Sequence, residues 1–168
     1  MCSSDLQMLC QQGENVHVIG IEGNFDDAQT GVKAMFTNPA LKKEMADKGY
    51  IFSSANSINI GRLVPQIVYY IYAYAQMLKE GDIGNGYKIN ICVPTGNFGN
   101  ILAAYYASFM GLPVNKLICA SNSNKVLYDF FRTGIYDKNR PFILTESPSM
   151  DILISSNLER LRDRKSVV

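Results

Sequence analysis

The turn at residues 94–100 is the strongest candidate for chemistry in the chain, and it reads Pro-Thr-Gly-Asn-Phe-Gly-Asn. An apolar segment typical of a β-strand precedes it, and an alanine-rich segment typical of a helix follows it. A helix N-terminus presents backbone N–H groups without partners and the positive end of the helix dipole. Glycine lets the backbone approach a bulky anion and adopt a positive φ without a clash. These features together predict a phosphate-binding site with Gly96 and Gly99 at the helix entrance.

A purely structural interpretation fits the same residues equally well. In that interpretation the segment is a tight turn between strand and helix, and Asn97 is the N-cap of the helix. The glycine spacing matches neither G-x-x-x-x-G-K-[ST] nor G-x-G-x-x-G, so neither a Walker loop nor a dinucleotide-binding loop is indicated.

The elements that position this turn alternate between strand and helix. Strands are expected near residues 16–21, 50–53, 89–93 and 116–120. Amphipathic segments predict six helices. One ends at residue 36, one follows residue 100, and the others lie over 40–48, 61–80, 122–132 and within 150–161. This order predicts an α/β fold whose sheet is mainly parallel, with helices on both faces.

A second loop should lie on the same edge of this sheet as the glycine turn. Ligands of such sheets bind outside the carboxyl ends of the strands, and the loop at residues 53–59 follows a predicted strand. Asn56, Ser57 and Asn59 are therefore candidate substrate contacts, although turn and capping hydrogen bonds explain the same residue types.

Composition excludes several classes of function. The chain has 168 residues, of which 47% are hydrophobic and 18% charged, and its net charge of +1 indicates neither a nucleic-acid nor a membrane partner. The cysteines are widely spaced and the chain has one histidine, so neither a metal site nor a disulfide scaffold is expected. Cys92 and Cys119 are predicted to be small core residues, and this usage predicts a reducing cytoplasm. The sequence gives no prediction of oligomeric state.

Five stretches in order resemble threonine synthase, an enzyme that uses pyridoxal 5'-phosphate (PLP) and has the fold of the tryptophan synthase β-like family. They cover residues 7–161 and are 23–29 (Gly-Asn-Phe-Asp-Asp-Ala-Gln), 54–59 (Ser-Ala-Asn-Ser-Ile-Asn), 93–104 (the glycine turn with its flanks), 110–113 (Met-Gly-Leu-Pro) and 147–157 (Ser-Pro-Ser-Met-Asp-Ile-Leu-Ile-Ser-Ser-Asn). Residues 1–6 and 162–168 fit no element pattern and are expected to be non-native ends, because they resemble a translated sequencing adapter.

The resemblance implies a fragment of a lyase of threonine biosynthesis, which converts O-phosphohomoserine and water to L-threonine and phosphate. It implies that the cofactor phosphate is held by Gly96, Asn97, Phe98, Gly99 and Asn100. The family's Schiff-base lysine has a Phe-Lys-Asp context that is absent here, so no catalytic residue is assigned and the fragment alone is expected to be inactive. The alternatives are a non-catalytic module that binds a phosphorylated ligand, and an interaction domain that uses the tyrosine-rich helix.

Overall fold

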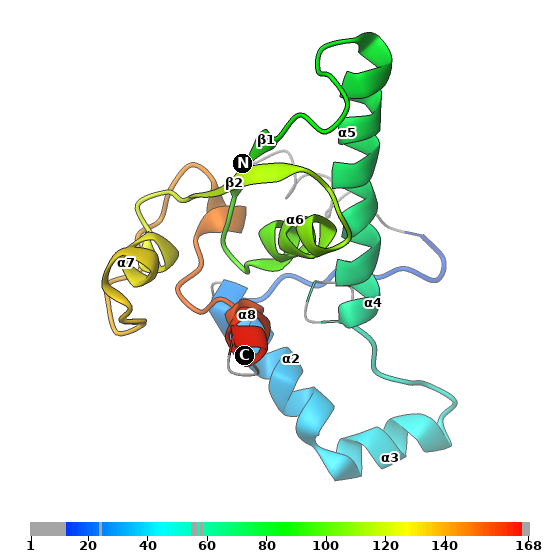
Figure 1. Cartoon of the computed structure of the whole chain (residues 1–168). Coiled ribbons are helices and arrows are strands. Elements are labelled where there is room, and N and C mark those ends of the chain that lie inside the picture. The colour runs from blue at the N-terminus through cyan, green and yellow to red at the C-terminus, as the bar shows by residue number, and fades with distance from the viewer. Residues whose placement is uncertain (1–12, 24, 55–56, 58, 166–168) are drawn as a thin grey trace.

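The structure is a computed structural model, and the residues that it describes are 13–23, 25–54, 57 and 59–165. Helices surround a pair of strands (Figure 1). The elements in chain order are α2 (Phe25–Thr37), α3 (Pro39–Asp47), α4 (Ile60–Leu63), the 3₁₀ turn η1 (Val64–Gln66), α5 (Ile67–Glu80), β1 (Ile89–Pro94), α6 (Gly99–Phe109), β2 (Val114–Ala120), α7 (Val126–Thr133), the 3₁₀ turn η2 (Pro148–Met150) and α8 (Leu158–Lys165).

Strands β1 and β2 form a parallel pair in which Val93 lies beside Cys119. The Thr95 N–H donates to the Ala120 carbonyl over 2.8 Å, which extends the pairing into the glycine turn. Parallel neighbours need a crossover connection, and α6 supplies it. The predicted α/β class and the two strands near 89–93 and 116–120 are therefore confirmed, and the turn at residues 95–98 starts from the carboxyl end of β1.

Helix α6 packs on one face of the strand pair and forms the centre of the core. Its apolar sequence is buried on most sides, as expected of a helix enclosed by other elements. In β1, Val93 faces this core and is 6% exposed, whereas Cys92 points the other way and is exposed. The prediction that Cys92 is a core residue is wrong, because successive side chains of a strand point to opposite faces. Cys119 is half-buried.

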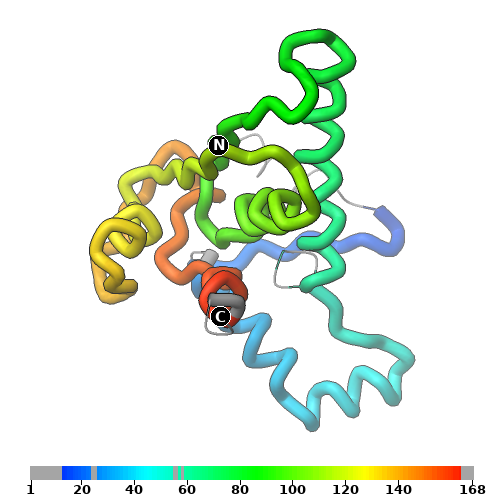
Figure 2. The backbone as a smooth tube through the Cα atoms, viewed as in Figure 1, coloured from blue at the N-terminus to red at the C-terminus, as the bar shows by residue number. Residues whose placement is uncertain are grey.

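A long helical rod made of α4, η1 and α5 stands beside α6, as Figures 1 and 2 show. Pro65 lies in η1, where its missing N–H removes a helical hydrogen bond and the turn tightens to 3₁₀ geometry. Gly81 ends the rod at a φ of 82°. The helix predicted over 61–80 is thus confirmed. Ile67 and Tyr74 are buried, whereas Tyr69 and Tyr72 are exposed.

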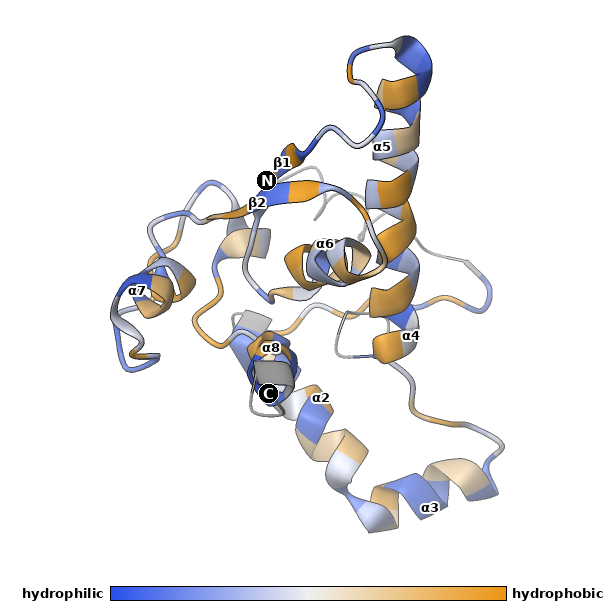
Figure 3. Cartoon of the chain, in the orientation of Figure 1, coloured by the Kyte–Doolittle hydropathy of each residue, from blue (hydrophilic) through white to orange (hydrophobic). Residues whose placement is uncertain are grey.

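Helices α2 and α3 form an arm that extends away from the strands (Figures 1 and 2). The Asn38 side chain caps α3 by accepting from the N–H groups of Ala40 and Leu41, and Pro39 occupies the first helical position. Figure 3 shows hydrophilic and apolar residues alternating along this arm, and α3 buries no residue. Both helices confirm the sequence-based prediction.

The strands predicted at residues 16–21 and 50–53 do not form in the described part of the chain. Val16 makes only an isolated bridge with Gly13, and Ile19 and Ile51 are 83% and 87% exposed. A strand requires a neighbouring backbone for its N–H and C=O groups, and neither segment pairs with another described strand. At the other end, α8 continues through residues 162–165, for which the sequence predicted no element.

None of the helices in the described part of the chain is long and apolar enough to cross a membrane. The same residues contain no group of three or more His, Cys, Asp or Glu side chains that could hold a metal ion.

Candidate functional site

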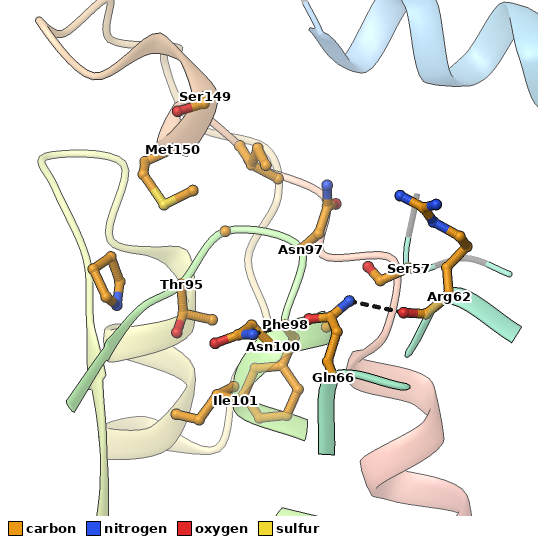
Figure 4. Close-up of a pocket in the computed structure, with 14 residues that line it drawn as sticks. Ser57, Arg62, Gln66, Thr95, Asn97, Phe98, Asn100, Ile101, Ser149 and Met150 are labelled. Carbon is orange, nitrogen blue, oxygen red and sulfur yellow. Dashed lines mark hydrogen bonds between the residues drawn. The ribbon is translucent and has the colours of Figure 1, made fainter. Parts of the chain in front are cut away.

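A cavity of about 240 Å³ lies at the carboxyl end of β1, and all five residues from Gly96 to Asn100 line it. Its volume lies just below the usual range of small-molecule sites, so it fits a small ligand or one group of a larger ligand. Figure 4 shows Ser57 and Arg62 on one side of Asn97, and Ser149 and Met150 on the other. The remaining wall residues are Gln66, Pro94, Thr95, Ile101 and Ile152.

The backbone of the turn delivers the N-terminus of α6 to this cavity. Phe98, and not Asn97 as the structural interpretation predicted, is the N-cap residue, and it has a left-handed conformation with φ 63°. Such a conformation costs a non-glycine residue about 1–3 kcal/mol. Burial of the Phe98 side chain, whose ring lies 5.9 Å from that of Phe131, offsets this cost. No described side chain caps this end, so the first N–H groups of α6 are left for a ligand.

Gly96 and Gly99 are required by close packing within the chain. Neither has a positive φ. A Cβ atom at Gly96 would lie 2.6 Å from Ile152 Cδ1, and one at Gly99 would lie 2.3 Å from Ser57 Oγ. The positive φ that glycine permits is therefore not used at these positions, and the steric limit comes from neighbouring side chains that line the same cavity.

A chain of hydrogen bonds ties the first turn of α6 to the helical rod. The Tyr70 hydroxyl donates to the Asn100 carbonyl over 3.1 Å and also contacts Asn100 Oδ1. Asn100 Nδ2 donates to Gln66 Oε1 over 2.9 Å, and Gln66 Nε2 donates to the Arg62 carbonyl over 3.0 Å (Figure 4). Burial raises the pKa of Tyr70 to about 12, so its hydroxyl remains a donor at neutral pH.

A second set of hydrogen bonds, made by Ser156, Asn157 and Arg160, clamps the turn from the other side. We call these three residues the C-terminal clamp. Asn157 is fully buried, and its Nδ2 donates to the Asn97 carbonyl over 3.0 Å and to Ser57 Oγ over 2.8 Å. Ser156 Oγ donates to Asn97 Oδ1 over 3.2 Å, and Arg160 Nη1 donates to the Ser57 carbonyl over 2.7 Å. The clamp therefore fixes both predicted loops relative to each other.

The wall at residues 149–152 is held by a buried carboxylate. Asp151 is 1% exposed and accepts from Asn122 Nδ2, Asn124 Nδ2, and both the N–H and the hydroxyl of Thr145, over 2.7–2.9 Å. Burial alone would raise the pKa of Asp151, but these hydrogen bonds outweigh burial and hold the pKa below its ordinary value. The side-chain amides of Asn122 and Asn124 thus donate to Asp151, and no side chain of the described residues caps α7.

The three candidate substrate residues have different positions. Ser57 lines the cavity together with the glycine turn. Asn59 does not line it; its Oδ1 caps α4 by accepting from the Gly61 N–H over 2.9 Å, as the structural interpretation of this residue type predicted. Asn56 lies outside the described residues.

Sequence reasoning missed several residues that build the site, namely Arg62, Gln66, Tyr70, Asn157 and Arg160. A repeated pattern could have revealed the two arginines. Ser-x-Asn-x-x-Arg occurs at residues 57–62 and again at residues 155–160, and each copy enters a helix.

No protein-family model matches the chain. The chain is 51% identical over 156 residues to threonine synthase-like 1 of Homo sapiens. The aligned residues cover 92% of this chain and 21% of that protein. Two solved structures are also similar. PLP-bound threonine synthase from Brucella melitensis is 44% identical with a TM-score of 0.73, and the match covers 92% of this chain and 31% of that one. Threonine synthase from Escherichia coli is 33% identical with a TM-score of 0.79, and the match covers 94% of this chain and 35% of that one.

The similarity extends over nearly all of the chain but over a minor part of each relative. The chain spans from about a fifth to a third of the length of the curated relatives that it matches. The resemblance to threonine synthase is confirmed over 92% of the chain, and the similar structures confirm the fold class.

Proposed function

We propose that this chain is a segment of a PLP-dependent threonine synthase and that residues 96–100 hold the cofactor phosphate. The observation that carries this proposal is the N-terminus of α6, which no described side chain caps and which lies in the wall of the cavity. Backbone N–H groups and the helix dipole favour an anion at that place. The similar structure from Brucella melitensis, which was solved with PLP bound, supports the identity of the ligand.

The residues present fit the phosphate group of PLP. Gly96 and Gly99 let the turn pack closely against Ile152 and Ser57 in the cavity wall, while Asn97 and Asn100 are immobilised by the hydrogen bonds at their carbonyls. A preorganised site of this kind binds an anion without first reorganising its own groups. When bound, PLP supplies an electron sink, and the protein supplies position and electrostatics.

The whole protein would convert O-phosphohomoserine and water to L-threonine and phosphate in threonine biosynthesis. No lysine is among the described residues that line the cavity, and Lys33, Lys42, Lys43, Lys48, Lys79 and Lys88 are all exposed. We therefore assign no catalytic residue within residues 7–161, the proposed extent of the catalytic-core segment. We also propose that residues 1–6 and 162–168 are non-native ends. We further propose that the protein is cytoplasmic and has neither a nucleic-acid nor a membrane partner.

Two alternatives have less support. An interaction domain built on the tyrosine-rich helix would use the exposed rings of Tyr69 and Tyr72, but Tyr74 is buried and Tyr70 donates to Asn100 at the cavity. A binding module without catalytic activity would use the same phosphate-binding residues 96–100, which we call the phosphate cradle. Only an assay of the reaction therefore separates it from the enzyme.

The test is to purify the full-length protein that carries this chain and to record its absorption spectrum with PLP. We expect bound PLP, and release of phosphate from O-phosphohomoserine with equimolar L-threonine. Borohydride reduction followed by peptide mapping should attach the cofactor to a lysine outside residues 7–161.

The variant that tests the phosphate cradle is Gly96→Val, because a side chain at this position would collide with Ile152 in the cavity wall. We expect its PLP affinity to fall at least tenfold, a change of about 1.4 kcal/mol in binding free energy. Unchanged affinity of a folded Gly96→Val protein contradicts the phosphate cradle. Bound PLP without any threonine formation contradicts the enzyme and favours the binding module.

A further inference from the structure

A second cavity, of about 440 Å³, is lined by residues of β2 and of the helices α6, α7 and α8 (Figure 1). This volume lies within the usual range of small-molecule sites. Most of its wall is aromatic or aliphatic and comes from Phe98, Ile101, Tyr105, Leu117, Phe131 and Leu161. The other described residues that line it are Cys119, Tyr128 and Arg132. An apolar wall with a few polar groups is typical of a site for a small organic ligand.

The second cavity shares part of its wall with the cavity at the glycine turn, because Phe98 and Ile101 line both. Phe98 is the N-cap residue of α6, and its left-handed backbone is maintained by burial of its ring. That ring lies 5.9 Å from the ring of Phe131, which lines the second cavity and not the first. A ligand in the second cavity would therefore pack beside the ring that holds the backbone of the phosphate cradle.

The charge of the second cavity comes from α7. Arg132 is exposed, and its Nη1 donates to the Tyr128 hydroxyl over 2.9 Å. Its side chain makes no ion pair with any residue that the structure describes, so most of its five N–H donors remain for a ligand. Burial raises the pKa of the Cys119 thiol, which therefore stays uncharged at neutral pH. Arg132 is thus the one ionised group among the described lining residues, and it favours an anion.

We propose that the second cavity binds a small aromatic carboxylate and that this ligand strengthens PLP binding at the phosphate cradle. The aromatic body suits a wall that contains the rings of Phe98 and Phe131, and the carboxylate suits the planar fork of donors on Arg132. A ligand that packs beside Phe98 stabilises the conformation in which the N-terminus of α6 faces the cofactor phosphate. The coupling rests on the proposed function, in which residues 96–100 hold that phosphate. Binding to the second cavity does not depend on it.

The test uses calorimetric titration of the full-length protein, with and without PLP, by 1-naphthylacetate and by its uncharged analogue 1-naphthylacetamide. We expect one molecule of 1-naphthylacetate to bind per chain, about fivefold more tightly or better when PLP is bound, and PLP affinity to rise by the same factor when the probe is bound. The amide should bind about tenfold more weakly or worse, because it cannot form the charge-assisted hydrogen bonds.

Three variants locate the binding. Arg132→Gln should weaken 1-naphthylacetate by about 10- to 100-fold and leave the amide unchanged. Leu117→Trp should abolish binding of both probes, because the larger side chain fills the cavity, and circular dichroism checks that this variant is folded. The control Lys138→Gln removes one positive charge from an exposed residue outside the cavity and should change neither probe.

The other outcomes overturn the inference in distinct ways. Absence of probe binding would show that other parts of the full-length protein fill the cavity. Binding that survives both Arg132→Gln and Leu117→Trp would place the probe elsewhere. Equal probe affinity with and without PLP would refute the coupling. If the protein binds no PLP at all, the proposed function and the coupling both fail, whereas the titrations without PLP still decide whether the second cavity is a binding site.

Discussion

At the residue scale, the two glycines and the buried Asp151 determine the shape of the cavity. A Cβ at Gly99 would lie 2.4 Å from Ser57 Cβ as well as 2.3 Å from its Oγ, and neither atom is the far end of a flexible chain. Asp151 fixes the opposite wall through Asn122, Asn124 and Thr145. Single substitutions at these positions therefore change the shape of the cavity.

Gly99→Ala should destabilise the protein and displace Ser57. We expect the free energy of unfolding to fall by about 1–3 kcal/mol, as for overpacking in a core, and PLP affinity to fall with it. Gly31→Ala is the control, since it lies inside α2 with nothing within 4 Å of the added Cβ. It should raise stability by up to about 1 kcal/mol. Urea unfolding of both variants measures the difference, and equal effects of the two would contradict the packing explanation.

Asp151 should make stability depend on acidic pH. Because its pKa is held below the ordinary value in the folded protein, the ionised form stabilises the fold above about pH 4, and this contribution is lost as the pH falls through the folded pKa. Asp151→Asn should remove this dependence and cost about 1–3 kcal/mol at neutral pH, because buried donors lose their acceptor. Melting temperatures of both proteins between pH 2 and pH 7 check this. Parallel curves for the two proteins would show that Asp151 does not contribute.

At the element scale, the site is assembled by the N-termini of helices and the segments that hold them. The rod holds α6 through Tyr70 and Gln66, and the C-terminal clamp holds the glycine turn through Asn157. These contacts join segments that are 30 to 60 positions apart in the chain. The turn is consequently rigid only while α5 and α8 are both packed against it.

Asn157→Leu should loosen the glycine turn. The substitution keeps the size of the side chain but removes the side-chain donor to the Asn97 carbonyl and to Ser57 Oγ, while the backbone N–H of residue 157 still donates to the Asn97 carbonyl. We expect a loss of about 1–3 kcal/mol in stability and faster hydrogen exchange at residues 95–100. Asn139→Leu, at an exposed loop position, is the control and should change neither quantity. Exchange as slow as in the unmodified protein would contradict the role of the clamp.

At the scale of the whole molecule, the described chain exposes many large apolar side chains. Figure 3 shows apolar residues along the rod, where Val68 is 60% and Tyr69 63% exposed. Elsewhere, Ile51 is 87% and Leu144 82% exposed. Exposed apolar surface of this extent favours association or aggregation in water.

The isolated 168-residue chain should therefore associate with itself and should not form threonine. Lys88 lies just before β1, and a strand of six residues spans about 20 Å, so its amine cannot reach the turn at the other end. Mass spectrometry after addition of PLP and borohydride should find no stoichiometric attachment to one lysine. A monomeric chain with one fully modified lysine that releases phosphate from O-phosphohomoserine would refute this prediction.

The sequence by itself determined the local features of this protein. Asn38 and Pro39 begin α3, Gly134 ends α7, and the turn at residues 94–100 joins a strand to a helix as predicted, because caps and turns depend on residues within about four positions. Only the tertiary structure decided which apolar runs become strands and which polar side chains share a cavity. Residues 16–21 have the pattern of a strand but no described neighbour to pair with. Asn157 bonds the glycine turn and Arg62 lines the same cavity because distant segments pack together, which no local periodicity encodes.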